Sequence, residues 1–157
     1  MRKMILVIAL MILPLTPNSL FAEALPKGAD FSLQDTQDNT VSLSDYKDKH
    51  AVLLVFWTTW CPFCRKELVS LKNRYPELKK DGVELLAVNV GEGVEKVERF
   101  IKPYNFPFPI LLDQETSVSR AFGIMGVPSY ILIDKKSEIV FQDNSFPEQA
   151  YKDLISK

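Results

Sequence analysis

Cysteine and histidine are scarce in this chain of 157 residues, which holds two cysteines and one histidine. A structural zinc site takes about four ligands and iron–sulfur clusters take more cysteines, so Cys61, Cys64 and the distant His50 are too few for either. Covalent haem attachment needs a histidine directly after the second cysteine, and residue 65 is an arginine. We therefore expect no metal site and no cofactor.

Blocks of like charge, internal repeats and cofactor-binding motifs are also missing. The 19 basic and 20 acidic residues give a formal net charge of −1, and they form no basic face of the kind that nucleic-acid binding needs. The chain is 46% apolar and 25% charged, which is typical of a soluble globular domain, and it is long enough for one buried core. We expect a monomer that binds no nucleic acid.

The first 24 residues differ from the rest of the chain. The basic pair Arg2-Lys3 precedes an apolar run at residues 4–13, and Ala22-Glu23-Ala24 has the small-residue form of a cleavage site. This pattern predicts a signal peptide cleaved near residues 22–24, followed by a single domain at residues 25–157. The run is short for crossing about 30 Å of hydrocarbon, although an uncleaved signal would anchor the chain. We expect secretion across the inner membrane, to a periplasmic or extracytoplasmic location.

Hydrophobic periodicity predicts an α/β layered sheet. Residues 51–57 and 83–90 are mostly apolar, as expected for central strands buried on both faces. A helix at residues 62–80 carries one apolar stripe, formed by Cys64, Leu68, Leu71, Tyr75 and Leu78. The other predicted elements are a hairpin at 31–34 and 40–43, a turn capped by Ser44, helices at 94–102, 116–122 and 147–156, and strands at 110–112, 129–133 and 138–142.

The two cysteines are three residues apart, where a predicted strand gives way to a helix. A disulfide with so small a loop adds only roughly 2 kcal/mol of stability, so structural stapling is a poor explanation for the spacing. The dipole and free N–H groups at a helix N-terminus favour a thiolate. Lowering a thiol pKa from about 8.5 to about 7 raises the thiolate fraction at pH 7 from ~3% to about half. We interpret the pair as a redox-active disulfide, with Cys61 as the nucleophile and Cys64 as the resolving thiol.

Two segments resemble the thioredoxin family. Phe-Trp-Thr-Thr-Trp-Cys-Pro-Phe-Cys at residues 56–64 is similar to its active site, and residues 123–129 are similar to its cis-proline loop. The hairpin and Val88-Asn89-Val90-Gly91-Glu92 resemble the TlpA/ResA-like branch of extracytoplasmic thiol-disulfide oxidoreductases, which is related to the AhpC/TSA family. The resemblance implies a three-layer thioredoxin-like fold, with a central mixed sheet, an N-terminal β-hairpin and an extra β-α insertion before the cis-proline loop. It also implies that the Val127–Pro128 bond is cis and faces the cysteines.

The same resemblance assigns roles to residues around the cysteines. Glu92 matches an acid that lies near the pair in this branch, where it would raise the pKa of the first cysteine and accept the proton of Cys64. The alternative for Glu92 is a solvated loop acid. The residues expected to contact substrate are Trp60, Pro62, Phe63, Val127 and Pro128.

On this basis we expect a reductant of disulfides in exported proteins, apocytochrome c among them, that is itself reduced by a membrane-embedded thiol reductant. Other functions stay open. Thr58 stands three residues before Cys61, as in a thiol peroxidase, but Leu54 occupies the position where a proline would be expected. A disulfide-forming oxidant can also have Cys-Pro-x-Cys, although the histidine that stabilises a strongly acidic thiolate is absent. A binding or chaperone module with inert cysteines is the last alternative.

Overall fold

The structure, a computed structural model, describes residues 29–156. The predicted signal peptide and its cleavage site lie outside the described residues. Within residues 29–156, no helix is both long and apolar enough to cross a membrane. The elements in chain order are β1 (Ser32–Gln34), β2 (Thr40–Ser42), the 3-10 helix η1 (Leu43–Tyr46), β3 (Ala51–Trp57), α1 (Pro62–Lys80), β4 (Val83–Val90), α2 (Val94–Ile101), β5 (Ile110–Asp113), α3 (Ser117–Ala121), β6 (Ser129–Ile133), β7 (Ile139–Asp143) and α4 (Glu148–Ile155).

A mixed five-stranded sheet runs through the centre of the molecule, in the strand order β5-β4-β3-β6-β7. β4 is parallel to both β3 and β5, whereas β6 is antiparallel to both β3 and β7. β1 and β2 form a separate antiparallel hairpin, which a bridge between Asp35 and Leu111 joins to β5. The predicted central mixed sheet and N-terminal hairpin are confirmed. The extra β-α insertion was predicted between Val90 and Gly123, where the chain forms α2, β5 and α3.

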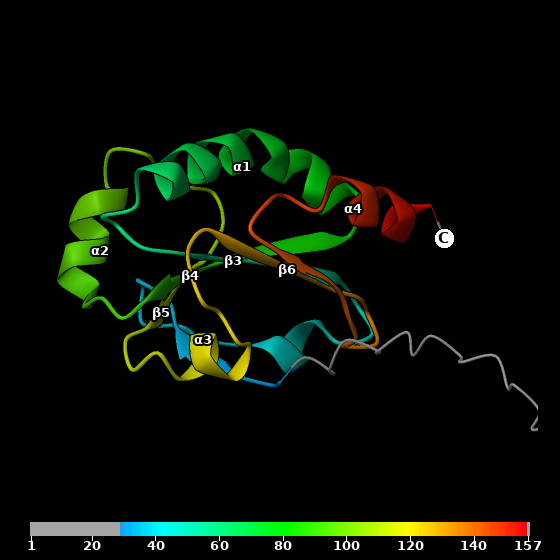
Figure 1. Ribbon diagram of the computed structural model, residues 1–157, viewed down its shortest axis with the longest axis horizontal. Helices are drawn as coiled ribbons and strands as arrows, with labels where there is room; N and C mark the ends of the chain where they lie inside the picture. The colour runs from blue at the N-terminus through cyan, green and yellow to red at the C-terminus, as the bar shows by residue number, and fades with distance from the viewer. Residues whose placement is uncertain (1–28, 157) are drawn as a thin grey trace, which may run out of the picture.

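Helices cover both faces of the sheet and give the molecule three layers (Figure 1). α1 and α4 lie on one face, and α3 and η1 lie on the other. Strand β3 explains this arrangement, because successive side chains of a strand point to opposite faces. Leu53 and Val55 pack in the core beneath α1, while Val52 and Leu54 pack in the core beside α3. Both faces of β3 are therefore buried, which accounts for its lack of polar residues.

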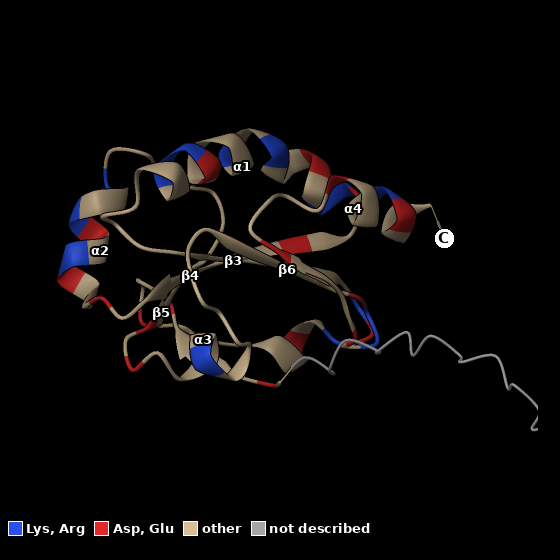
Figure 2. Cartoon of the chain, viewed as in Figure 1, with Lys and Arg blue, Asp and Glu red and all other residues tan. Residues whose placement is uncertain are grey.

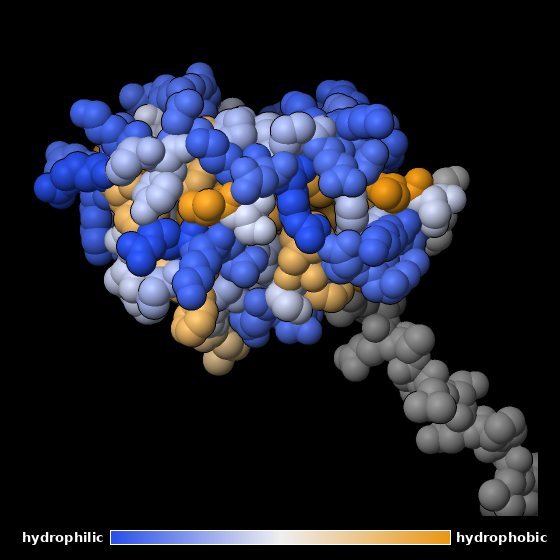
Figure 3. Space-filling model, turned by 90° about the horizontal axis from the view of Figure 1, so that it is seen from above, coloured by the Kyte–Doolittle hydropathy of each residue, from blue (hydrophilic) through white to orange (hydrophobic). Residues whose placement is uncertain are grey.

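Charged side chains lie on the outer helices. Figure 2 shows both signs mixed along α1, α2 and α4. On the face that carries α1 and α4, hydrophilic surface surrounds separate hydrophobic spots (Figure 3). The apolar stripe of α1 turns inward as its spacing predicted, since Leu68, Leu71 and Leu78 are each at most 1% exposed.

The start of η1 differs from the prediction. Its N-cap is Ser42, whose backbone N–H donates to the Asp45 carboxylate at 3.1 Å, whereas Ser44 lies inside the turn. Ser42 and Asp45 stand three residues apart, and this spacing of a serine and an acid makes a reciprocal capping box. Ser44 has no acid at that distance, so the predicted cap was wrong by two residues.

Candidate active site

Three segments of the chain meet at one end of the central sheet. In the parallel pair of β3 and β4, Trp57 is aligned with Asn89, so the segments that follow both strands leave at the same edge. In the antiparallel pair of β3 and β6, Phe56 is aligned with Ser129, which brings the residues preceding β6 to that edge as well. The turn before α1, the loop after β4 and the loop before β6 are thereby gathered at one place.

The first segment holds the cysteines at the N-terminus of α1. Cys61 is the N-cap residue, Pro62 takes the first helical position, and Cys61 and Cys64 are joined by a disulfide. Pro62 suits this position because the N–H that it lacks would have no partner inside the helix. The backbone N–H of Cys64 donates to the Cys61 sulfur at 3.1 Å. The Cys61 sulfur therefore lies at the positive end of the helix dipole, where a thiolate is favoured.

The second segment is the loop before β6. The Val127–Pro128 bond is cis, and the Val127 carbonyl oxygen lies 3.7 Å from the Cys61 sulfur. The loop is held from both sides: the Ser129 hydroxyl donates to the Gly126 carbonyl at 2.7 Å, and the Asn144 amide donates to the Pro128 carbonyl at 2.7 Å. The predicted cis bond facing the cysteines is confirmed.

The disulfide is recessed while its surroundings are exposed and apolar. Cys61 and Cys64 are 4% and 1% exposed, whereas Trp60 and Phe63 are 69% and 68% exposed. Met125, in the loop before β6, is 98% exposed. Monomeric proteins seldom leave large apolar side chains so fully in water, and a group of them beside a reactive bond indicates a contact surface for another molecule.

The third segment carries Glu92, which is buried. Its carboxylate accepts hydrogen bonds from the Thr59 backbone N–H at 2.7 Å, the Thr59 hydroxyl at 2.7 Å and the Asn89 amide at 2.8 Å, and it pairs with Lys96 Nζ at 2.6 Å. Burial would raise the pKa of this carboxyl, but the hydrogen bonds from Lys96, Asn89 and Thr59 outweigh burial and hold its pKa below the ordinary value. Glu92 is thus a charged, fully bonded group at neutral pH, and the alternative of a solvated loop acid is wrong.

Thr59 and Lys96 are parts of the site that the sequence analysis missed. Lys96 stands four residues after Glu92 at the start of a predicted helix, and this spacing of opposite charges is a signal that could have found it. Thr59 lies 33 residues from Glu92, and no local pattern indicates that contact. His50, the only histidine of the chain, is an exposed loop residue outside the site.

A cavity of about 410 Å³ lies beside the disulfide, lined among others by Thr58, Trp60, Lys96, Met125 and Val127. It joins all three segments of the site. The hydroxyl of Thr58 and the side-chain oxygen Oδ1 of Asn89 are buried and have no hydrogen-bond partner within the described part of the chain. Within the same residues, no group of three or more His, Cys, Asp or Glu is placed to hold a metal ion.

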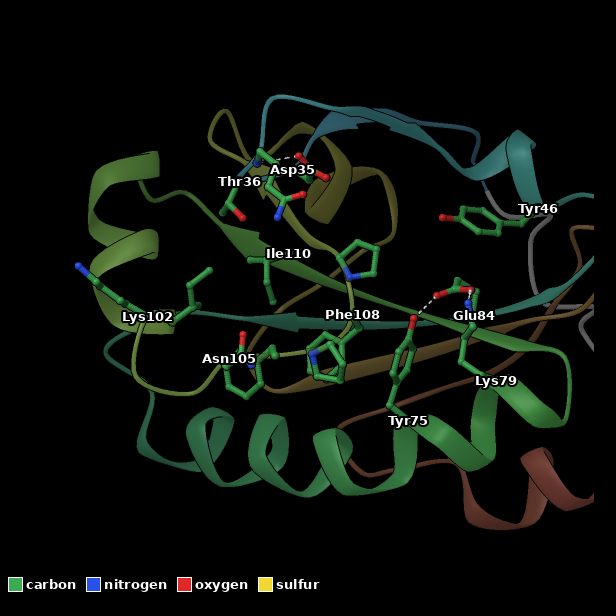
Figure 4. Close-up of a pocket in the computed structure, with 15 residues that line it drawn as sticks. Asp35, Thr36, Tyr46, Tyr75, Lys79, Glu84, Lys102, Asn105, Phe108 and Ile110 are labelled. Carbon is green, nitrogen blue, oxygen red and sulfur yellow. Dashed lines mark hydrogen bonds and ion pairs between the residues drawn. The ribbon is translucent and has the colours of Figure 1, made fainter.

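A second cavity, of about 560 Å³, lies between α1, the β1–β2 turn and the connector that leads into β5 (Figure 4). Tyr75 donates to the Glu84 carboxylate at 2.7 Å, and Lys79 pairs with the same group at 3.1 Å. No residue of the three segments described above lines this cavity. The smaller cavity is the one beside the thiols, because residues of all three segments line it and one of them, Val127, places its carbonyl oxygen 3.7 Å from the Cys61 sulfur.

Comparison with known proteins supports this assignment. The AhpC/TSA family model matches residues 26–142. The thiol-disulfide oxidoreductase ResA of Bacillus subtilis is 40% identical over 128 residues, which cover 78% of this chain and 71% of that protein. ResA of Geobacillus kaustophilus is 43% identical over 110 residues, covering 70% of this chain and 63% of that protein, so the chain aligns with slightly less than two thirds of its length.

Solved structures show the same fold. StoA from Bacillus subtilis superposes with a TM-score of 0.69 at 28% identity, covering 84% of this chain and 100% of that one. The thioredoxin domain of a thiol-disulfide oxidoreductase from Bacteroides vulgatus superposes with a TM-score of 0.73 at 25% identity, covering 85% of this chain and 96% of that one. With a cysteine pair on a helix N-terminus, a cis-proline opposite it and these relatives, the chain belongs to the AhpC/TSA family, as a thioredoxin-fold thiol-disulfide oxidoreductase similar to ResA.

Proposed function

We propose that this protein reduces disulfide bonds in exported proteins. The observation that carries the proposal is the recessed Cys61–Cys64 pair at the tip of α1, 3.7 Å from the carbonyl of the cis-proline loop. Such a pair can hold two electrons as a dithiol and release them as a disulfide. The N-terminus of α1 stabilises the Cys61 thiolate. The exposed backbone and side chains around the pair form a surface on which the substrate chain can bind.

Cys61 is the attacking thiol and Cys64 the resolving thiol. The Cys61 thiolate attacks one sulfur of a substrate disulfide, so a mixed disulfide forms and one substrate thiolate leaves. Cys64 then loses its proton and attacks the Cys61 sulfur, which releases the second substrate thiolate and leaves the Cys61–Cys64 disulfide. The released thiolates take up two protons, and two electrons have passed to the substrate. The geometry supports this order, because Cys61 is the N-cap residue, its sulfur accepts the Cys64 backbone N–H at 3.1 Å and it lies 3.7 Å from the Val127 carbonyl oxygen, whereas Cys64 lies within α1.

The substrate chain binds across the exposed residues around the pair. Trp60 and Phe63 flank the disulfide, and the backbone of Val127 and Pro128 presents an edge that an extended peptide can pair with. Pro62 is exposed between the cysteines and shapes the same surface. This mode of binding recognises an extended backbone together with apolar side chains, and it suits unfolded or flexible protein substrates.

Glu92 contributes to the exchange through its fixed charge. It anchors the backbone N–H of Thr59, two residues before Cys61, and so orients the turn that presents the thiol. Four donors already engage its two oxygens, and no contact between Glu92 and either sulfur is found among the described residues, so the carboxylate acts on the thiols through its charge, which disfavours a nearby thiolate.

The place of action is outside the cytoplasm. The pattern of residues 1–24 supports export, by a signal peptide that is either cleaved or kept as an anchor. Exported thiols are readily trapped as disulfides in oxidising compartments, so a dedicated reductant has substrates there. Apocytochrome c before haem attachment is one such substrate, and a membrane-embedded thiol reductant is the electron donor.

Trapping tests the proposal. In cells that express the full chain, Cys64→Ala leaves Cys61 able to attack but removes the thiol that resolves the mixed disulfide, so exported proteins should accumulate in disulfide-linked adducts. Cys61→Ala is the matched control and should trap none. Adducts that form equally in both variants, or purified reduced protein that fails to reduce a peptide disulfide, would contradict the proposed function.

One observation favours a second activity, the reduction of peroxides. Thr58 lies three residues before Cys61 and lines the cavity beside the disulfide, and its buried hydroxyl has no partner within the described residues. A small polar oxidant that reached this wall of the cavity would supply the hydrogen-bond partner that the hydroxyl lacks. Consumption of hydrogen peroxide by the reduced protein, compared between the natural chain and Thr58→Val, tests this alternative; a rate equal to that of a free thiol would dismiss it.

A further inference from the structure

Among residues 29–156, Lys96 is the one charged partner of the buried Glu92 carboxylate at the active site. It lies in the first turn of α2, and its Nζ is 2.6 Å from Glu92 Oε1. The Lys96 side chain is 54% exposed, whereas that of Glu92 is 5% exposed. A buried charge that loses its partner is left uncompensated in a medium of low dielectric, so the pair has a larger effect than an exposed ion pair on the same kind of helix turn.

The other contacts of Glu92 are neutral. Oε2 accepts from the Thr59 backbone N–H and from the Asn89 amide, and Oε1 accepts from the Thr59 hydroxyl. These donors orient the carboxylate without cancelling its charge. Glu95, the neighbouring acid on α2, is exposed to solvent. Among the described contacts of Glu92, compensation of its charge therefore comes from Lys96.

The ion pair is joined to the thiols by two routes. Glu92 binds the backbone N–H of Thr59, two residues before Cys61. Lys96 also lines the cavity of about 410 Å³ that Val127 lines, and the Val127 carbonyl is 3.7 Å from the Cys61 sulfur. A net negative charge at Glu92 would oppose the stabilisation that the helix N-terminus gives to a Cys61 thiolate, and a neutral pair would not.

We infer that Lys96 is a positioning residue for disulfide exchange, which neutralises and fixes Glu92 and thereby keeps the Cys61 thiol reactive. The inference rests on the proposed function, because it assigns Cys61 as the attacking thiol. Loss of the ammonium group leaves the three neutral hydrogen bonds, which keep Glu92 ionised in the pH range where thiols titrate. An uncompensated carboxylate then remains bonded to the turn that leads to Cys61, and the Cys61 thiolate forms less readily.

The test is the pH dependence of Cys61 alkylation by iodoacetamide, measured in a Cys64→Ala background so that Cys61 is the only thiol. Lys96→Met should move the inflection to higher pH and slow alkylation at pH 7 by about threefold to tenfold, as a shift of up to one pKa unit requires. Lys96→Arg keeps the charge and should restore the natural profile. Lys152→Met is the matched control, because Lys152 forms the same i,i+4 pair with Glu148 at 3.0 Å on α4.

A cycle with Glu92 separates this role from a structural one. In a Glu92→Gln background, Lys96→Met should no longer slow alkylation, because the charge that Lys96 compensates is gone. Should Lys96→Met fail to fold, Lys96→Gln removes the charge with a polar side chain and gives the same readout. Two results would overturn the inference. One is a pH profile of Cys61 alkylation that Lys96→Met leaves unchanged in the Cys64→Ala background. The other is a shift of the inflection in Lys96→Arg as large as that in Lys96→Met. Failure of the proposed function appears elsewhere, as an absence of trapped adducts in Cys64→Ala with its alkylation profile intact.

Discussion

Glu92 illustrates how one residue serves both the stability and the chemistry of this protein. Three hydrogen bonds and one ion pair reach its carboxylate. Their donors lie in the turn before α1, in β4 and in α2. The ionised carboxylate therefore holds these three segments together. Protonation of Glu92 should weaken its contacts with them, and with these contacts the hold on the turn that carries Cys61.

This linkage predicts a pH dependence of stability. The folded state holds the pKa of Glu92 below its ordinary value of 4.5, so the charged group stabilises the fold above that pH, and this contribution is lost as the pH falls through the folded pKa. Glu92→Gln should therefore lower the free energy of unfolding by about 1.5–3 kcal/mol at pH 7, the range for hydrogen bonds to charged groups. The deficit should shrink below pH 4.5.

Urea unfolding of the natural chain and of Glu92→Gln between pH 7 and pH 3 measures this difference in the free energy of unfolding. Other acids whose pKa is lowered, such as Asp35 and Glu148, are present in both proteins and cancel in the comparison. A deficit that stays constant over the whole range would mean that the Glu92 charge does not contribute to stability.

At the scale of elements, α1 positions the thiols and must itself be held on the sheet. Leu68 lies one turn beyond Cys64 and is completely buried between α1 and the strands, whereas the adjacent Val69 is 39% exposed. Leu68→Ala should lower the free energy of unfolding by about 2–5 kcal/mol, because it leaves a cavity in the core. Val69→Ala on the same helix is the control and should change it by less than about 0.5 kcal/mol. Equal effects in thermal or urea unfolding would show that α1 is not docked as described.

The loop before β6 depends on a side chain from another element. Asn144 follows β7, and its amide donates to the Pro128 carbonyl at 2.7 Å and to the Ser129 hydroxyl at 2.9 Å. Asn144→Ala should cost about 1 kcal/mol of stability and should slow reduction of a peptide disulfide, since the loop edge that seats the substrate is no longer held. Alkylation of Cys61 by a small reagent should not change, because such a reagent does not need to bind the loop.

Asn39→Ala provides the comparison for this prediction. Asn39 also makes a side-chain hydrogen bond, to Asp35 at 3.0 Å, but in the exposed turn between β1 and β2. Asn39→Ala should leave the rate of peptide-disulfide reduction unaltered. A decrease in alkylation as large as the decrease in peptide reduction in Asn144→Ala would show that the loop acts on the thiol rather than on the substrate.

The elements that the sequence predicted best are those with an unbroken pattern. The strand at residues 51–57, the helix at 62–80 and the strand at 83–90 match β3, α1 and β4, because long buried runs and a regular apolar stripe leave little freedom. Strand order and register depend on which strands pair across the molecule, and periodicity does not contain that information. The family resemblance implied the three layers and the mixed sheet, but the order and the register come from the structure. The contact of Glu92 with Thr59 escaped prediction for the same reason.

At the scale of the whole molecule, three segments place exposed apolar side chains around the recessed disulfide. Trp60 comes from the turn before α1, Phe63 from α1 itself and Met125 from the loop before β6. The thiols are thus reached through a surface that the fold assembles from distant parts of the chain. Selectivity for large substrates should therefore depend on this surface, and reactivity on the groups behind it.

The double variant Phe63→Ser with Met125→Ser tests that separation. Burial of a large apolar side chain against a partner is worth about 1.5–3 kcal/mol when complete, so partial loss at two positions should raise the KM for a protein disulfide by roughly tenfold or more. Reduction of a small disulfide such as oxidised glutathione should change little, because it does not span the surface. Ile155→Ser on α4, where the side chain is 42% exposed, is the control for removing an exposed apolar residue elsewhere. If both substrates slowed together, Phe63 and Met125 would be acting on the cysteine pair itself, and the substrate would have to be recognised by another face of the molecule.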